Sequence, residues 1–140
     1  MTKYTFDEGI NEVIKKTDDL LHHAPAIISQ YTGHLAKSSG KLIRARALLA
    51  CSLDEENRVN QDSVQLAAAI ELFHLATLVH DDIIDDADTR RGLPTLQKMF
   101  GKRTAVICGD YLLSISLREA AKIQVPSQEK QQEGQRENFL

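Results

Sequence analysis

Five aspartates stand close together in this 140-residue chain, at positions 81, 82, 85, 86 and 88. On a helix, Asp81 and Asp85 would lie one turn apart, as would Asp82 and Asp86. Each such pair of like charges costs about a few tenths of a kcal/mol. The acids also follow a long apolar stretch, toward the C-terminal end of the expected helix, where the helix dipole disfavours anions. A solvated acidic helix end is one interpretation. Divalent-metal binding explains the cluster better, and oxygen ligands without a nearby cysteine predict Mg²⁺, which binds through one or two carboxylates plus substrate phosphates.

Basic residues and a histidine surround these acids in the sequence. Arg90 and Arg91 follow them directly, and Lys41 and Arg44 stand at the start of an earlier expected helix. His74 precedes the first aspartate by seven positions and so lies on nearly the same helix face. Each group alone is typical of a solvated surface or a core histidine. Together they predict a site for phosphate oxygens, whose usual partners are arginine forks and lysine ammonium groups.

The elements that must position these residues are helices. Aromatic residues make up only 5% of the chain, while Ala and Leu recur, which favours packed helices over sheets. Apolar spacing predicts helices over 6–22, 41–53 and 102–122, and a buried helix that is capped by Asp62 or Ser63 and leads to the acids. Pro25 either kinks the first helix or opens a second one that ends near Gly33. We expect one all-α domain over residues 1–123 and a polar, disordered tail over 124–140.

Composition narrows the function classes. The net charge of −3 gives no reason to expect a nucleic-acid or anionic-membrane surface. The apolar run 64–79 is interrupted by Gln65, Glu71 and His74, which argues against a membrane span, and the first nine residues show no signal peptide. Cys51 and Cys108 both stand among small apolar residues and are expected to be buried thiols in a reducing, cytoplasmic compartment.

The sequence resembles a known family at these residues. The stretch ELFHLATLVHDDIIDDADTRRGLPT, with SGKLIRA at 39–45 and GDYLL at 109–113, is similar to the trans-isoprenyl diphosphate synthases, or polyprenyl synthetases, over about 41–113. The resemblance implies an antiparallel helix bundle around a central cavity, incomplete in this chain. It also implies Mg²⁺-dependent, head-to-tail condensation of isopentenyl diphosphate with an allylic diphosphate.

The resemblance also assigns roles to residues. Asp81 and Asp85 would hold Mg²⁺, with Asp82 sharing in catalysis and Asp86 supporting it. Arg90 would hold the allylic diphosphate. Isopentenyl diphosphate would be held by a second set, which comprises Lys41, Arg44, His74 and Arg91.

Product length follows from the side chains just before the acids. In the family, the residues four and five positions before the first aspartate line the cavity for the growing chain. Here they are Thr77 and Ala76, both small, which predicts a medium-to-long polyprenyl product. Phe73, one turn deeper, is a candidate floor of that cavity.

Departures from the family pattern set further expectations. Ser39, Leu42 and Ala45 replace a glycine, an arginine and a proline of the family's GGKRxRP motif. No second aspartate-rich motif follows Asp88, so the isolated chain is expected to be truncated, inactive, and poorly folded or dependent on a partner. Family members are typically cytoplasmic homodimers. Two alternatives stay open: a non-catalytic partner subunit of a heteromeric synthase, and an unrelated helical Mg²⁺-binding module.

Overall fold

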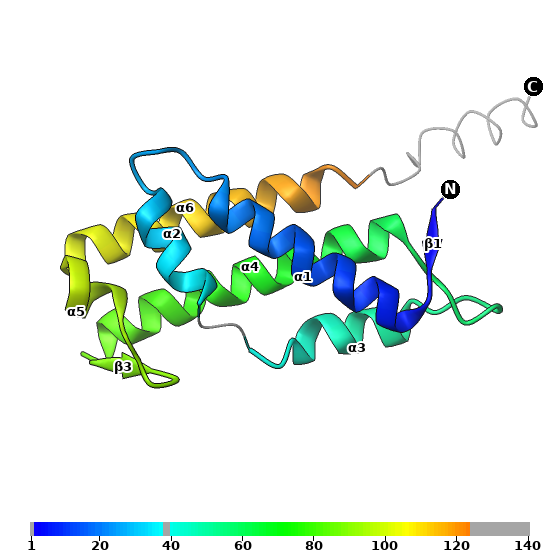
Figure 1. Cartoon of the computed structure of the whole chain (residues 1–140), viewed down its shortest axis with the longest axis horizontal. Coiled ribbons are helices and arrows are strands. Elements are labelled where there is room, and N and C mark those ends of the chain that lie inside the picture. Colours follow the sequence, from blue (N-terminus) through cyan, green and yellow to red (C-terminus); the bar gives the residue numbers. More distant parts are fainter. Residues whose placement is uncertain (1, 38–39, 124–140) are drawn as a thin grey trace, which may run out of the picture.

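Helices make up most of the structure, a computed structural model that describes residues 2–37 and 40–123 (Figure 1). Within these residues the helices are α1 (Phe6–His22), α2 (Ser29–Ala36), α3 (Ile43–Cys51), α4 (Gln61–Ile84), α5 (Leu96–Phe100) and α6 (Lys102–Ala121). Two antiparallel pairs of two-residue strands join them, β1 (Lys3–Tyr4) with β2 (Val59–Asn60), and β3 (Thr89–Arg90) with β4 (Leu93–Pro94). The all-α prediction is confirmed. The predicted tail over 124–140 and the departure at Ser39 lie outside the described residues.

Side-chain caps fix where the long helices begin. Thr5 and Glu8 form a capping box at the start of α1, which satisfies two backbone N–H groups reciprocally. At the start of α4, the side chain of Asn60 accepts a hydrogen bond of 2.8 Å from the N–H of Ser63. The predicted cap at Asp62 or Ser63 was therefore wrong by about half a turn, because Asn60 ends β2 in an extended conformation and supplies the capping oxygen itself.

The central helix is α4, which runs the length of the molecule beside α1, α3 and α6 (Figure 1). Its first half packs Val64, Ala67 and Ala68 into one core cluster with residues of α1 and α3. Its second half packs into another cluster with α6, which includes Cys108 and Leu112. Among the described helices α4 is also the one long and apolar enough to cross a membrane, but 44% of its apolar window is buried inside the structure, as in a core helix.

A close approach of α4 and α6 depends on Gly109. This buried glycine lies against the imidazole of His80, and a Cβ atom at this position would collide with the ring. Nε2 of His80 lies 3.4 Å from the carbonyl oxygen of Val106 and 3.3 Å from a carboxylate oxygen of Asp110. The glycine of the GDYLL segment thus lets α6 pack tightly beside the end of α4.

The cysteines differ from each other. Cys108 is buried between α4 and α6, and burial raises the pKa of its thiol to about 11. Cys51 is exposed, so the prediction that both thiols are buried was wrong for this residue. The outer face of α3 has no neighbouring element among the described residues, which leaves the end of that helix open.

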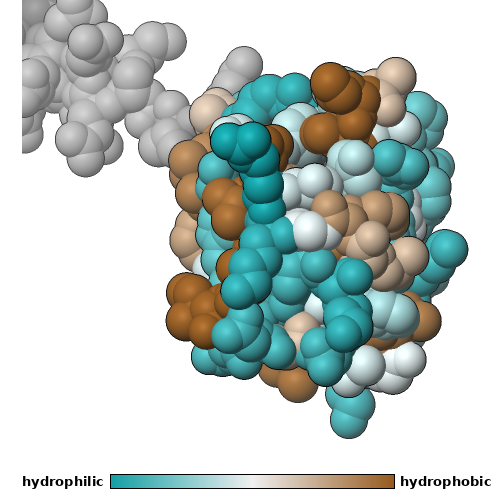
Figure 2. Space-filling model, turned by 90° about the vertical axis from the view of Figure 1, so that its left-hand side faces the viewer, coloured by the Kyte–Doolittle hydropathy of each residue, from teal (hydrophilic) through white to brown (hydrophobic). Residues whose placement is uncertain are grey.

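Exposed apolar side chains line α3, α4 and α6. Soluble monomers rarely expose large contiguous apolar patches. The largest exposed side chains on these helices are Ile43, Leu66, Phe73, Ile84, Val106, Ile107 and Leu117. A space-filling view from one end shows hydrophobic side chains exposed at several places between hydrophilic ones (Figure 2). The three helices therefore carry apolar surface that the described part of the chain leaves uncovered.

A buried carboxylate ties α6 to α1 and α4. Glu119 is fully buried and accepts hydrogen bonds from Gln65 (2.6 Å) and Lys122 (2.8 Å), with Lys16 of α1 at 3.8 Å. Burial by itself raises the pKa of Glu119, but the hydrogen bonds from Lys122 and Gln65 and the charges of Lys122 and Lys16 outweigh it. The pKa of Glu119 therefore lies below its ordinary value of 4.5. The ionised form is the one that stabilises the fold.

Replacing Glu119 by Gln is expected to lower the free energy of unfolding by about 1 to 3 kcal/mol at pH 7, because charge-assisted hydrogen bonds are lost. A depressed folded-state pKa gives stability that is present above the unfolded-state pKa and is lost as the pH falls through the folded-state pKa. Urea unfolding of the wild type and the variant should therefore converge below pH 4.5. Glu55→Gln, the same change at an exposed position, is the control. A difference that persists undiminished in acid would contradict this account.

Candidate active site

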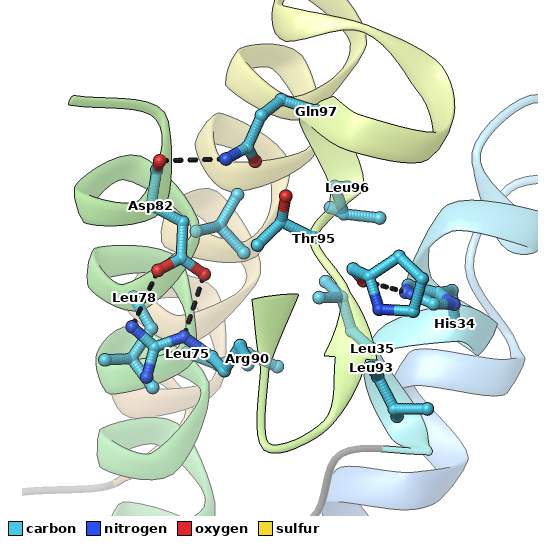
Figure 3. A pocket seen from close by; sticks show the side chains of 12 residues that line it. His34, Leu35, Leu75, Leu78, Asp82, Arg90, Leu93, Thr95, Leu96 and Gln97 are labelled. Carbon is cyan, nitrogen blue, oxygen red and sulfur yellow. Dashed lines mark hydrogen bonds and ion pairs between the residues drawn. The ribbon is translucent and has the colours of Figure 1, made fainter. Parts of the chain in front are cut away.

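Asp82 and Arg90 form the best-defined ion pair of the site. Asp82 is only 7% exposed, near the end of α4, and Arg90 belongs to β3. Nε and Nη2 of Arg90 each donate a hydrogen bond of 2.8 Å to the two carboxylate oxygens (Figure 3). This bidentate pair fixes the plane of the guanidinium group and leaves its remaining N–H groups available.

Gln97 stabilises the turn that follows Asp82. Its Nε2 donates to the backbone carbonyl oxygen of Asp82 at 2.8 Å (Figure 3). It also donates to the carbonyl oxygen of Ala87 at 2.8 Å. Its Oε1 is buried and has no hydrogen-bond partner among the described residues. Together with Asp82 and Arg90, it lines a small cavity between α2, α4 and the β3–β4 hairpin. Sequence reasoning missed this residue, because nothing in the local pattern shows that an amide 15 positions after Asp82 returns to it.

The outer acids are paired with lysines. α4 ends at Ile84, and Asp86 takes a left-handed conformation (φ 50°) that turns its carboxylate to Lys102, at 2.8 Å. Asp88 lies 3.6 Å from Lys98. The expectation that Asp82 and Asp86 face each other one helical turn apart was therefore wrong, because the helix stops between them.

The other two acids of the cluster are Asp81 and Asp85. Both are exposed, and neither carboxylate has a hydrogen-bond or ion-pair partner within residues 2–37 and 40–123. They stay one turn apart, since the N–H of Asp85 donates to the carbonyl oxygen of Asp81 at 2.9 Å. Both act on Arg90: the hydrogen bond that Arg90 donates to Asp82 is the largest cause of the raised pKa of Arg90, and the charges of Asp81 and Asp85 add to it.

These two carboxylates fit a magnesium ion. The described part of the chain brings together no group of three His, Cys, Asp or Glu side chains able to enclose a metal. A pair of unpartnered carboxylates suits Mg²⁺, which keeps several water ligands and shares its coordination sphere with substrate phosphates. Of the five acids, two have no ion-pair partner among the described residues, and these are the two to which the family resemblance assigns the metal.

A second group of charges gathers at the start of α3. The guanidinium of Arg91 lies against Gly40, where a Cβ atom would collide with it, so the hairpin turn meets the segment before α3. Arg44, on the first turn of α3, and Arg91 both act on His74 of α4. Lys41 is exposed beside them. In the described residues, Lys41, Arg44 and Arg91 have no carboxylate partner within ion-pair distance, so their charge is available to an anion.

The state of His74 follows from these neighbours. Burial is the largest cause that lowers the pKa of its imidazole, and the charges of Arg44, Arg90 and Arg91 lower it further. Glu71, three positions earlier, opposes the shift. The net pKa lies below 6.5, so the ring is mainly neutral at pH 7.

The three residues predicted to set product length separate into two environments. Ala76 is 2% exposed and packs in the core cluster shared with α6. Phe73 is 47% exposed, and the half-buried Thr77 lies one turn further along the same side of α4. The structure thus brings Phe73 and Thr77 to the open face of α4 but leaves Ala76 inside.

Known proteins with similar sequences and folds identify the family of this chain. The profile of the family described as Polyprenyl synthetase matches residues 25–134. This chain belongs to the polyprenyl synthetase family. Its helical fold is that of the isoprenoid synthases: the crystal structure of heptaprenyl diphosphate synthase from Staphylococcus aureus superimposes with a TM-score of 0.78 and 30% identity, covering 89% of this chain and 39% of that one.

Curated relatives of this polyprenyl synthetase family member are longer. It is 32% identical over 124 residues to heptaprenyl diphosphate synthase component 2 of Bacillus subtilis, covering 88% of this chain and 35% of the relative. It is 44% identical over 94 residues to the protein of the same name from Geobacillus stearothermophilus, covering 66% of this chain and 29% of the relative. The chain spans about a third of the length of these relatives.

Proposed function

We propose that this chain supplies the first aspartate-rich half of a Mg²⁺-dependent polyprenyl diphosphate synthase. The enzyme would join isopentenyl diphosphate head to tail to an allylic diphosphate and make a medium-to-long product. One observation carries the proposal: Asp81 and Asp85 are unpaired acids at the end of α4, with Arg90 close by and unpaired cations at the start of α3. In a complex of Mg²⁺ with a diphosphate, the metal ion would pair with the two acids and the diphosphate would pair with the cations.

The chain's own residues have distinct tasks in this scheme. Asp81 and Asp85 would hold Mg²⁺, which when bound stabilises charge on the departing diphosphate. Arg90, oriented by Asp82, donates its remaining N–H groups to the allylic diphosphate. Lys41, Arg44, His74 and Arg91 hold isopentenyl diphosphate. Donors that are already oriented lose little freedom when charge develops on the leaving group.

The apolar face of α4 has a different task. When the allylic carbon–oxygen bond breaks, the diphosphate leaves with the electron pair and a carbocation remains. The isopentenyl double bond attacks that cation, and a proton is then lost. Water must be excluded during these steps, which suits the face that carries Phe73 and Thr77. No nucleophilic side chain is required.

A chimera tests this proposal. Residues 1–123 joined to the remainder of the Staphylococcus aureus heptaprenyl diphosphate synthase should convert labelled isopentenyl diphosphate and an allylic diphosphate into polyprenyl diphosphate in the presence of Mg²⁺. The 140-residue chain assayed alone should give no product. A correctly folded chimera without turnover would overturn the proposal, and turnover by the isolated chain would contradict the expectation that it is inactive.

A partner subunit is the second candidate function. The two Bacillaceae relatives are named as component 2 of heptaprenyl diphosphate synthase, which indicates an enzyme of more than one component. In this case the chain would be non-catalytic and would act in a heterodimer. The catalytic form would act as a homodimer or a heterodimer. Both forms would be cytoplasmic. Co-purification from the native cell with a second chain that carries another aspartate-rich motif would favour the heteromer.

Thr77→Phe in the chimera is expected to shorten the product by at least one isoprene unit, because a bulky ring on the open face of α4 blocks the growing chain. Ala76→Phe should instead cost about 1 to 3 kcal/mol of stability, because it overpacks the interior between α4 and α6. Reversed-phase separation of products and urea unfolding measure the two effects. Short products from a stable Ala76→Phe chimera would show that position 76, rather than 77, lines the cavity.

A further inference from the structure

The N-cap residue of α3 does not cap the helix with its side chain. The first N–H groups of a helix have no partner within the helix and are usually satisfied by a side chain just before it. The N-cap residue here is Leu42, and its side chain makes no capping hydrogen bond. Instead, the N–H of Ala45 donates a hydrogen bond of 3.0 Å to Oε1 of Glu71, from α4.

The backbone at this point is also strained. Leu42 has φ 55°, a left-handed conformation that leucine rarely adopts. Its half-buried side chain packs against the core cluster formed by α1, α3 and α4, which keeps it in place. Nε of Arg46 donates to the carbonyl oxygen of Lys41 at 3.0 Å. The segment that carries Lys41 and Arg44 is therefore held by apolar packing of Leu42 and by specific hydrogen bonds, of which Ala45 to Glu71 is one that reaches α4.

The negative charge of Glu71 is unexpected so close to a proposed diphosphate site. It is half-buried, and its carboxylate acts on His74 together with Arg44 and Arg91. A carboxylate here opposes the binding of a diphosphate by simple Coulomb repulsion. Its hydrogen bond to the N–H of Ala45 joins the first turn of α3, which carries Arg44, to α4.

We propose that Glu71 is a positioning residue, which fixes the start of α3 against α4 so that Lys41 and Arg44 converge with His74 and Arg91 on one diphosphate. The inference rests on the proposed function of the same site. The hydrogen bond needs the N–H of Ala45, which a proline at this position, as in the family motif, would lack.

Pyrophosphate binding to the 140-residue chain tests the role of Glu71. With inorganic pyrophosphate and Mg²⁺ in a calorimeter, Glu71→Ala should raise the Kd about tenfold, since the cations lose their fixed spacing. Glu71→Gln keeps an oxygen acceptor for Ala45 and should bind within about twofold of the wild type, or more tightly. Amide exchange at Ala45 should accelerate in Glu71→Ala and stay slow in Glu71→Gln. Circular dichroism confirms that each variant is folded.

Ala45→Pro removes the donor itself and completes a double-mutant cycle. Glu71→Ala should cause no further rise in the Kd in that background, where it removes only the opposing charge, and this comparison keeps the test valid if the single variant folds poorly. Equal losses for Glu71→Ala and Glu71→Gln, an unchanged Kd in Glu71→Ala, or a full tenfold loss in the Ala45→Pro background would each overturn the inference alone. A wild-type chain that does not bind pyrophosphate although the folded chimera turns over would overturn this inference alone, whereas a folded chimera without turnover would overturn the proposed function.

Discussion

Replacing both Asp81 and Asp85 by asparagine is expected to abolish turnover by the chimera, with a loss of at least about 1000-fold in kcat/KM. A bound metal supplies several kcal/mol of transition-state stabilisation, and each 1.36 kcal/mol corresponds to a factor of ten. The same change should leave stability unaltered or raise it by about a few tenths of a kcal/mol, because it removes a like-charge pair one turn apart. Opposite signs for activity and stability distinguish a metal site from a structural acidic cluster.

Asp88→Asn is the matched control for the double substitution. It makes the same chemical change in the same turn, at an exposed carboxylate whose partner, Lys98, lies 3.6 Å away. Exposed ion pairs contribute about 0 to 1 kcal/mol, so neither activity nor stability should change greatly. Retention of substrate coupling in the Asp81→Asn, Asp85→Asn chimera would exclude these residues as the metal ligands. Binding of Mg²⁺ without any dependence on pyrophosphate would contradict the proposal that the ion is shared with a diphosphate.

A double-mutant cycle on Asp82 and Arg90 is expected to give the second large effect. In urea unfolding of the 140-residue chain, Asp82→Asn and Arg90→Gln should each destabilise by about 2 kcal/mol, because each leaves a partly buried charge without its bidentate partner. The double variant should be less destabilised than the sum of the two, with a coupling energy of about 1.5 to 3 kcal/mol.

Arg90→Lys completes this experiment. Lysine keeps the positive charge but cannot donate two parallel hydrogen bonds, so it should recover little of the coupling energy. In the chimera, Asp82→Asn should raise the KM for the allylic diphosphate, since Arg90 is no longer oriented. A coupling energy near zero would show that the two side chains are neighbours without a mutual energetic role.

The sequence predicted the long elements well, because their apolar periodicity is strong. The prediction for 6–22 matches α1, and that for 102–122 matches α6 to within one residue. Spacing also placed the acids at the end of the buried helix. The short pieces were missed: α5 has five residues and the strands two each, so none shows a period of its own.

Part of the site was not predictable, because it depends on where α4 stops and on contacts between distant residues. Only the end of α4 at Ile84 and the left-handed turn at Asp86 decide which acids meet a lysine and which remain unpaired. The burial of Ala76 depends on the packing of α6, which side-chain size alone does not reveal. The bond between Ala45 and Glu71 joins residues 26 positions apart, and the local pattern at neither residue indicates it.

The hairpin of β3 and β4 gives two adjacent arginines different neighbours. Arg90, in its extended strand, reaches Asp82, whereas Arg91, with φ 51°, turns its guanidinium to Gly40. A single peptide unit therefore separates the side chain assigned to one substrate from the side chain assigned to the other. The hairpin therefore fixes the separation of the two guanidinium groups, and inserting one residue between the two arginines would change the distance between the two proposed diphosphate sites.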